Sequence, residues 1–284
     1  MNIQWYPGHM VKAKRMVQEN LKLVDVVIEL ADARLPESSR NPDLLEIIGS
    51  KPRMLVLNKV DLADEEATRQ WRQYYKNSGL EVVLANSLTG QGFREMEAAA
   101  VRLTKAKLDA LLAKGQRPRA IRAMIAGIPN VGKSSFINRL VGKGTAKTAD
   151  KPGVTRGKQW VRFGGNFELL DTPGILWPKF EDPQVGYKLA VTGAIRDQLL
   201  DEVELAAQLL GWLRENAPEQ VKARYKLEEL AVDNHQLLDA IGKRRGCLVS
   251  GGNVDRTKAA AIVLDEFRGG KIGKFTLDEL PLSR

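Results

Sequence analysis

Short apolar runs alternate with amphipathic stretches between residues 24 and 170. The runs have the length of buried strands and lie at 24–30, 53–57, 81–84, 120–126, 158–163 and 166–170, the last two joined at Gly164-Gly165. Apolar side chains recur at helical spacing over 10–23, 64–76, 93–112 and 134–141. This alternation predicts an α/β fold, with a mostly parallel sheet flanked by helices.

The pattern changes after Pro178, where helical spacing takes over. Helices are expected at 197–216, 218–231, 234–243 and 255–267, the last ending at Gly269-Gly270. We therefore expect an α/β domain over 1–177 and a smaller, all-helical domain over 178–284. The stretch 32–42 is rich in Pro and Ser, so we expect it to be irregular.

Residues 127–135 read G-I-P-N-V-G-K-S-S and fit the phosphate-loop pattern G-x-x-x-x-G-K-[ST]. The glycines allow backbone N–H groups to approach phosphate oxygens at the start of a helix. Lys133 would reach the β and γ phosphates, and the Ser134 hydroxyl would ligate Mg²⁺. The rest of the candidate phosphate site consists of Asn130, Val131, Gly132 and Ser135. A Gly-rich turn without a ligand is the alternative, which the preceding strand and following helix disfavour.

A second motif, N-K-V-D at 58–61, fits the guanine-reading pattern N-K-x-D. An ionised Asp61 can accept hydrogen bonds from the ring N–H and the exocyclic amine of guanine, donors that adenine lacks at those positions. Lys59 would lie along the base, and Asn58 would tie this loop to the phosphate loop. After the next strand, Asn86 and Ser87 are placed where they could contact the guanine carbonyl.

The motif D-T-P-G follows the strand at 166–170 and occupies 171–174. Asp171 would accept a hydrogen bond from a Mg²⁺-bound water, and the Gly174 N–H would face the γ-phosphate. Thr155 could close over Mg²⁺ and the γ-phosphate, although an ordinary turn threonine is the alternative. The two loops would then act as switches that GTP orders and hydrolysis to GDP releases.

The order of these motifs is reversed relative to an ordinary GTPase, because N-K-x-D precedes the phosphate loop. A circularly permuted P-loop GTPase domain accounts for this order, since permutation is tolerated where termini lie close together. The D-T-P-G loop then leads directly toward the helical domain, which would couple γ-phosphate sensing to that domain.

Three further stretches carry a family resemblance: W-Y-P-G-H-M at 5–10, D-A-R-L-P-E-S-S-R-N-P at 32–42, and G-G-x-x-D at 251–255 with F-R-G-G-K-I-G at 267–273. Together with the permuted order, they make the chain similar to the YlqF/RbgA ribosome-biogenesis GTPases over essentially its whole length. The resemblance implies a GTPase of late large-subunit (50S) assembly, with the C-terminal domain contacting ribosomal RNA.

The residues after Gly174 are Ile175 and Leu176, which cannot orient an attacking water as a glutamine would. His9 is the local candidate for that role, and the resemblance implies catalysis for the histidine at this place. From the residues alone, His9 could instead cap the following helix or pack against Trp5. The resemblance to related GTPases also suggests that Asn130 helps to hold K⁺ against the phosphates.

The formal charge of +9 is concentrated in two segments. Residues 101–122 hold seven Lys or Arg and one Asp, and residues 143–162 hold six Lys or Arg and one Asp. Such clusters favour a polyanionic partner such as RNA, and a solvated helix face is the alternative. We expect no DNA partner and a monomer.

The single cysteine, Cys247, excludes an intramolecular disulfide, and residues 1–8 lack the features of a signal peptide. No apolar run approaches the ~18 residues that span a bilayer, so we expect a cytoplasmic protein with no membrane partner. Two other functions stay open: a GTP-dependent RNA-binding module with incidental hydrolysis, and an ATPase or small-molecule kinase.

Overall fold

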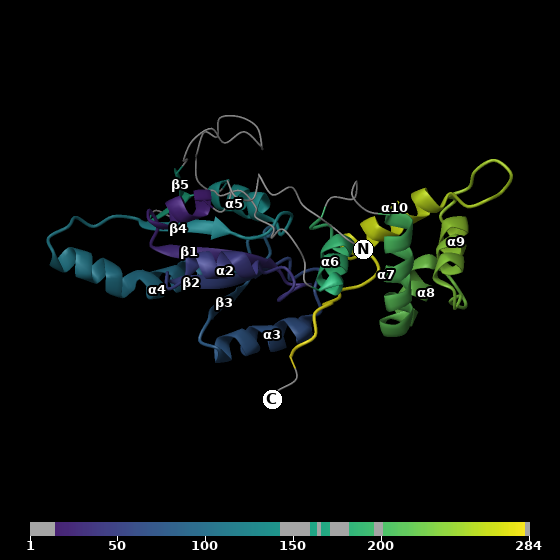
Figure 1. Cartoon of the computed structure of the whole chain (residues 1–284), viewed down its shortest axis with the longest axis horizontal. Coiled ribbons are helices and arrows are strands. Elements are labelled where there is room, and N and C mark those ends of the chain that lie inside the picture. Colours follow the sequence, from purple (N-terminus) through teal and green to yellow (C-terminus); the bar gives the residue numbers. More distant parts are fainter. Residues whose placement is uncertain (1–14, 143–159, 164–165, 171–181, 196–200, 282–284) are drawn as a thin grey trace. The chain divides into compact units, whose positions relative to one another are not determined.

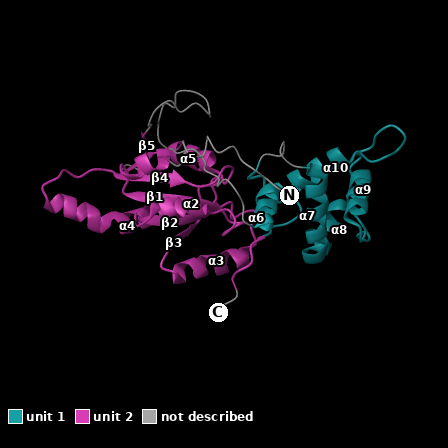
Figure 2. Cartoon of the chain, viewed as in Figure 1, with its two compact units in different colours: residues 1–3, 180–275 teal, residues 4–179, 276–284 magenta. Residues whose placement is uncertain are grey.

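The computed structural model describes residues 15–142, 160–163, 166–170, 182–195 and 201–281 (Figure 1). The chain divides into two compact units (Figure 2). The sheet unit comprises 4–179 together with 276–284, and the helical unit comprises 180–275 with 1–3. The C-terminal segment thus groups with the sheet, whereas the sequence placed all of 178–284 in the helical domain.

The sheet unit contains a mostly parallel sheet whose strands follow the order β3-β2-β1-β4-β6-β5. Its strands are β1 (Val26–Asp32), β2 (Arg53–Asn58), β3 (Glu81–Leu84), β4 (Ile121–Ala126), β5 (Trp160–Phe163) and β6 (Phe167–Leu170). Only the β5–β6 pair among these strands is antiparallel. Every residue of β1 is buried, as expected for a central parallel strand covered on both faces.

Helices cover both faces of the sheet. They are α2 (Pro42–Ile48), α3 (Glu65–Asn77), α4 (Phe93–Ala113) and α5 (Lys133–Val141), with a further helical turn at residues 15–21. Val27 and Ala31 point to one face, where they pack in clusters with α2 and α3. The other face is covered by α4, which runs along β1 to β4 and meets α5 through Phe93 and Phe136. The α/β fold predicted from the sequence is confirmed.

The parallel strands bring distant loops to one edge of the sheet. Asp32 at the end of β1 lies in register with Asn58 at the end of β2, and β4 pairs with β1 on its other side. The carboxyl ends of these three neighbours therefore meet, and the loop after β4 lies beside the loop after β2. A ligand site at this edge is the usual arrangement in open α/β sheets.

The helical unit consists of packed helices around an aliphatic core that includes Leu189, Leu209, Leu238 and Val263. Its helices are α6 (Pro183–Val191), α7 (Glu202–Asn216), α8 (Pro218–Tyr225), α9 (Asn234–Arg244) and α10 (Arg256–Arg268). Within the described part of the chain, no helix is both long and apolar enough to cross a bilayer.

One predicted helix differs from the structure, and two helices were not predicted. The helix expected over 218–231 ends at Tyr225, because Lys226 adopts a left-handed conformation with φ of 54° that closes it. Helices α2 and α6 were not predicted at all. Each begins with a proline in its first turn, at Pro42 and Pro183, where the missing N–H costs nothing. The sequence had predicted an irregular stretch over 32–42 and no element over 183–191.

Candidate functional site

The phosphate loop connects β4 to α5, in the strand-loop-helix context that the motif requires. The Lys133 amine lies within the loop, donating hydrogen bonds to the Gly127 and Ile128 carbonyls at 3.0 and 2.6 Å. Ser134 and Ser135 are exposed in the first turn of α5. In an α-helix the first N–H groups have no intrahelical partner, so those of Ser134 and Ser135 can face an anion.

The two glycines of the loop are required by close backbone approaches. Gly127 has φ of 156°, and a Cβ there would lie 2.4 Å from the Leu30 carbonyl oxygen. Gly132 has φ of 99°, and its Cβ would lie 2.5 Å from Asn58 Nδ2. The loop is therefore shaped by the ends of β1 and β2, which fixes the cradle against which phosphates would rest.

Asn58 joins the base-reading loop to the phosphate loop. Its Nδ2 donates to the Val131 carbonyl at 2.8 Å, and its Oδ1 accepts from the Ser87 N–H and hydroxyl at 3.1 and 2.7 Å. The side chain is 1% exposed, so these are buried bonds. Three loops that are far apart in the sequence are thus held together by one amide.

Lys59 makes a second connection between the loop after β2 and the phosphate loop. Its amine donates to the Asn130 carbonyl at 2.7 Å and pairs with the Asp32 carboxylate at 3.0 Å. Both Lys59 and Asn130 have φ of 60°, a conformation that asparagine tolerates better than most residues. The lysine of N-K-x-D therefore lies between the phosphate loop and a carboxylate at the end of β1.

Asp32 is a buried carboxylate between two cations. The Arg34 guanidinium binds it through Nε and Nη2 at 2.9 and 2.7 Å, in the bidentate geometry that favours such pairs. Burial alone would raise the pKa of Asp32, but the Arg34 and Lys59 cations outweigh burial and hold that pKa well below its usual range. Asp32 stays ionised and fixes the direction of the Lys59 amine.

Asp61 lies in the turn after β2 and is half-buried. Its carboxylate accepts no hydrogen bond from the residues that the structure describes, and its charge helps to raise the pKa of Arg34. Both oxygens can therefore accept hydrogen bonds from a ligand. This is the requirement for reading the two guanine donors.

Asn86 and Ser87 form bonds within their own loop region. Asn86 Oδ1 accepts from the Leu88 and Thr89 N–H groups at 2.8 and 3.3 Å, so this side chain caps the turn after β3. Ser87 donates to Asn58, as described above. The structure thus gives these two residues a role in shaping the loop, and contact with the guanine carbonyl stays a prediction.

Several predicted site residues lie outside the described residues. They are His9, Thr155, Asp171 and Gly174. The structure brings together the phosphate-binding and base-reading halves of the predicted site and leaves the switch and catalytic assignments as predictions. In the described ranges, no cluster of His, Cys, Asp and Glu forms a metal site by itself.

The comparisons with known proteins agree with this geometry. A family model described as 50S ribosome-binding GTPase matches residues 122–239, which include the phosphate loop but not 58–61. The Ribosome biogenesis GTPase A of Bacillus cereus is 56% identical over 278 residues, covering 98% of this chain and 94% of that protein. Its namesake from Thermotoga maritima is 31% identical, covering 97% and 94%.

The chain belongs to the ribosome biogenesis GTPase A family. It is also 34% identical to the Mitochondrial ribosome-associated GTPase 1 of Mus musculus, covering 97% of this chain and 90% of that one. A crystal structure of GNP-bound YlqF from Thermotoga maritima matches with a TM-score of 0.64 and 28% identity, covering 94% of this chain and 98% of that chain. The resemblance to the YlqF/RbgA GTPases and the permuted motif order are confirmed.

As a member of this family, the protein is a GTPase and binds guanine nucleotide. The described residues fit that ligand. A Cβ at Gly127 or Gly132 would fill the space of the phosphate loop, and the two carboxylate oxygens of Asp61 can accept hydrogen bonds. Sequence reasoning missed Asp32 and Arg34. The motif D-A-R was noted only as part of the resemblance, although a carboxylate at the end of a strand beside β2 could have suggested a partner for Lys59.

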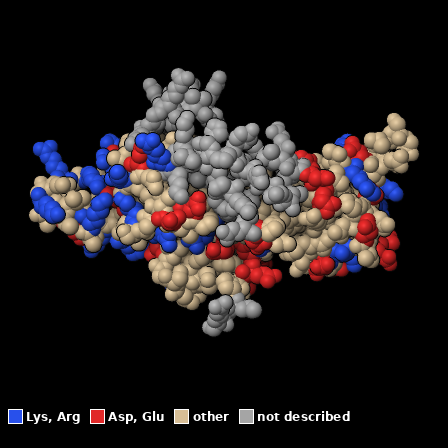
Figure 3. Space-filling model, viewed as in Figure 1, with Lys and Arg blue, Asp and Glu red and all other residues tan. Residues whose placement is uncertain are grey.

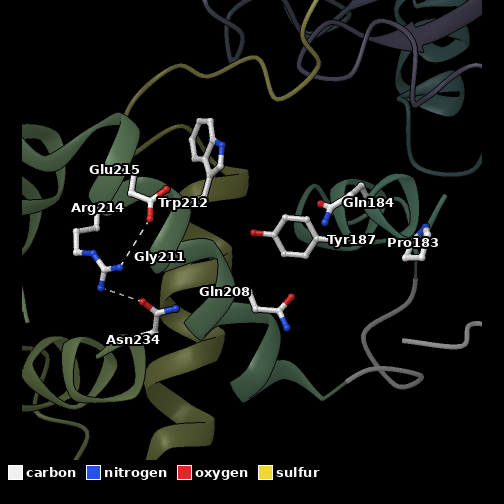
Figure 4. Close-up of a pocket in the computed structure, with 9 residues that line it drawn as sticks. All are labelled: Pro183, Gln184, Tyr187, Gln208, Gly211, Trp212, Arg214, Glu215 and Asn234. Carbon is white, nitrogen blue, oxygen red and sulfur yellow. Dashed lines mark hydrogen bonds and ion pairs between the residues drawn. The ribbon is translucent and has the colours of Figure 1, made fainter. Parts of the chain in front are cut away.

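The helical unit has a groove of its own, with a volume of about 580 Å³ (Figure 4). It is lined by Pro183, Gln184, Tyr187, Gln208, Gly211, Trp212, Arg214, Glu215 and Asn234. Arg214 bonds to Asn234 Oδ1 at 3.0 Å on one wall, and the Tyr187 ring approaches from α6. None of the predicted nucleotide-site residues lines this groove. It is a feature of the helical unit separate from the GTPase site.

Proposed function

We propose that this GTPase hydrolyses GTP to GDP and phosphate in the cytoplasm during late assembly of the large (50S) ribosomal subunit, in contact with ribosomal RNA. The observation that carries the proposal is the junction of the two nucleotide-reading loops through Asn58 and Lys59. It supports binding of base and phosphates at one edge of the sheet. The names of the relatives support the ribosomal partner.

The phosphates would be held by the Lys133 amine and by the backbone N–H groups of the first turn of α5. Ser134 and Thr155 would ligate Mg²⁺, and Asp171 would hold one of its waters. When bound, Mg²⁺ neutralises charge on the β- and γ-phosphate oxygens. The Gly174 N–H would report whether a γ-phosphate is present.

The attacking water needs a polar group, since Ile175 and Leu176 follow Gly174. We assign that role to His9. A K⁺ ion beside Asn130 would add positive charge next to the phosphates. The exposed position of Asn130, at a left-handed turn of the phosphate loop, supports this second assignment.

Contact with ribosomal RNA is supported by a basic surface on α4 and the chain that follows it. Figure 3 shows Lys and Arg gathered over this region, which we call the α4 basic surface. Its exposed members are Arg102, Lys105, Lys107, Lys114, Arg117 and Arg119. Such a surface would neutralise phosphates beside whatever contact the helical unit makes with the RNA, and it would make binding to the particle weaken with added salt.

The test is GTP hydrolysis with and without large ribosomal subunits, over a range of salt concentrations and in K⁺ or Na⁺. We expect slow basal turnover, stimulation by the particle of about tenfold or more, weaker stimulation at high salt, and faster hydrolysis in K⁺. Absence of stimulation at every salt concentration would overturn the proposal. Equal rates in the two cations would remove the K⁺ assignment alone.

The two histidines of the chain supply a matched pair of variants. His9→Ala should remove the stimulated rate, whereas His235→Ala, on α9 and 3.4 Å from Glu204, should leave it intact. If His9→Ala keeps particle-stimulated hydrolysis, His9 is not the catalytic group. If the particle binds in a GTP-dependent way but hydrolysis is never stimulated, the chain is a GTP-dependent RNA-binding module. Tighter binding of ATP than GTP would indicate an ATPase or kinase.

A further inference from the structure

The last residues of the chain make specific contacts with the sheet unit. The Leu277 N–H donates to the Arg34 carbonyl at 2.8 Å. The Asp278 carboxylate accepts hydrogen bonds from the N–H groups of Glu37 and Ser38 at 2.9 and 2.7 Å, and from the Ser38 hydroxyl at 2.6 Å. We call residues 277–280 the C-terminal clasp.

The clasp is built into the sheet unit by burial as well as by hydrogen bonds. Asp278 is 7% exposed, and its backbone carbonyl accepts from Nε1 of Trp71 at 3.3 Å. Leu280 packs against the cluster that contains Trp71 and Tyr75. Removing a carboxylate from water is costly unless hydrogen bonds replace its hydration, and here backbone and hydroxyl donors do so. A tail that merely rested on the surface would not bury a charge in this way.

The loop that the clasp holds is the one that carries the partners of the guanine-reading lysine. Arg34, whose carbonyl accepts from the clasp, binds Asp32 through its guanidinium. Asp32 in turn pairs with Lys59 at 3.0 Å, and Lys59 reaches the Asn130 carbonyl. Each step is a hydrogen bond or ion pair; the steps up to Lys59 join buried or half-buried groups, and the last one reaches the exposed Asn130. A continuous set of contacts therefore runs from Asp278 to the phosphate loop.

We propose that the C-terminal clasp positions Lys59 for the guanine nucleotide, and that Asp278 is a positioning residue of the GTPase site. Asp278 fixes the loop 34–40, and that loop fixes the Asp32–Arg34 pair that directs the lysine. Loss of the clasp lets Arg34 and Asp32 shift together, so that the Lys59 amine loses its fixed direction. The loss of the clasp therefore weakens contacts to the base, and the affinities for GDP and GTP fall by the same factor.

The clasp begins directly after the helical unit in the sequence. Phe275 packs in the helical unit against Phe267 and Trp212, with ring centroids 5.9 and 5.8 Å away. Leu277, two residues later, already bonds to Arg34 in the sheet unit. The boundary between the two units therefore falls between Phe275 and Thr276, directly before the clasp.

The test compares two neighbouring carboxylates of the clasp. Asp278→Asn removes the charge that accepts the loop N–H groups, and Glu279→Gln removes the same charge from an exposed residue next to it. Dissociation constants for GDP and for a non-hydrolysable GTP analogue are measured with the full chain. We expect Asp278→Asn to weaken both nucleotides by about tenfold, in line with loss of a group that orients a ligand-binding side chain. Glu279→Gln should change neither.

Two further measurements separate positioning from general stability. At saturating GTP, kcat of Asp278→Asn should match the unaltered chain while KM rises, because the reacting phosphate is not touched. Trp71→Phe, which removes the Nε1 bond to the clasp without altering its charge, should raise KM in the same direction by a smaller factor. Amide hydrogen exchange at Glu37 and Ser38 shows whether the loop has been released.

The inference rests on the guanine assignment of the site, and the results keep the two apart. If the unaltered chain binds no guanine nucleotide, the proposed function fails. If it binds GDP, and Asp278→Asn speeds exchange at Ser38 while leaving both dissociation constants unchanged, the clasp has only a structural role. A variant that lowers kcat and leaves KM unchanged would also overturn the positioning role.

Discussion

Each end of β1 carries a buried aspartate. Asp25 immediately precedes the strand and Asp32 ends it, and they are 1% and 4% exposed. At each end, burial would raise the carboxylate pKa, and nearby cations reverse that effect and hold the pKa well below its usual range. Both carboxylates are therefore buried and held ionised by nearby cations.

Their partners differ. Asp25 binds Lys107 at 2.6 Å and Arg119 at 2.7 and 2.9 Å, which lie on α4 and on the chain leading to β4. Asp32 binds Arg34 and Lys59, and Lys59 reaches the phosphate loop. One carboxylate organises cations at the amino edge of the sheet, and the other organises them at the carboxyl edge. A buried carboxylate with cationic partners therefore does not by itself indicate a functional site. Its position at the carboxyl edge of the sheet, beside the phosphate loop, is what distinguishes Asp32.

The largest expected effect comes from the backbone at the carboxyl edge. Gly132→Ala would place a Cβ 2.5 Å from Asn58 Nδ2 at φ of 99°, which would displace the junction of the two loops. We expect the GDP dissociation constant to rise by about a hundredfold, as for other misplacements of binding groups by ~1 Å. Isothermal titration with GDP measures this.

Gly115→Ala is the matched control at the other edge, on the chain leading to β4. It has φ of 79° with no atom near its added Cβ, so only the strain of a left-handed alanine remains. That strain is about 1–2 kcal/mol. If Gly115→Ala weakens GDP as much as Gly132→Ala does, the two edges do not differ in the way described.

The second effect concerns the base. Asp61→Asn exchanges one acceptor for a donor, which suits the C2 carbonyl of xanthine and not the C2 amine of guanine. The preference for GDP over XDP should fall by about a hundredfold, as competition between the two nucleotides would show. Asp64→Asn, at the N-cap of α3, is the control, since asparagine caps equally well. An unchanged preference in Asp61→Asn would remove the guanine assignment.

The smallest effect on the site, and the most direct comparison, comes from Asp25→Asn and Asp32→Asn. Asp32→Asn should lower the free energy of unfolding by about 2–4 kcal/mol, because it leaves the buried Arg34 guanidinium without a carboxylate. Asp25→Asn should lower it less, because Lys107 and Arg119 are exposed to water. Only Asp32→Asn should also weaken GDP, by about tenfold. Denaturant titration and GDP binding on the same samples separate the two effects.

The loss of folding stability at acid pH provides a further comparison of Asp25 and Asp32. A carboxylate whose pKa is lowered in the folded state stabilises fully above its unfolded pKa of about 3.9, and that contribution is lost as pH falls below it. The unaltered chain should lose stability steeply below about pH 4. Each Asn variant should show a shallower loss. Equal slopes in all three would mean that neither carboxylate is held ionised by its cations.

Much of the fold and half of the site could be predicted from the sequence, because those parts depend on local patterns. Apolar runs gave the strands within about two residues, and the phosphate loop and N-K-x-D are contiguous motifs whose backbone sets their own geometry. Their reversed order led directly to the permuted fold. Pro42 misled the prediction, because a proline can begin a helix as readily as it interrupts one, and α6, which also begins at a proline, was not predicted.

The sequence by itself determined the α/β GTPase fold, and it predicted which residues read base and phosphate at one edge of the sheet. Only the tertiary structure decided what holds those residues in place. Asp32 lies 27 positions before Lys59, and Asp278 lies 240 positions after Ser38. No spacing rule connects such residues, because a carboxylate takes whichever donors the packed sheet brings within about 3 Å. The order of the strands sets the partners of Asp32, and the return of the C-terminal segment to the sheet sets those of Asp278.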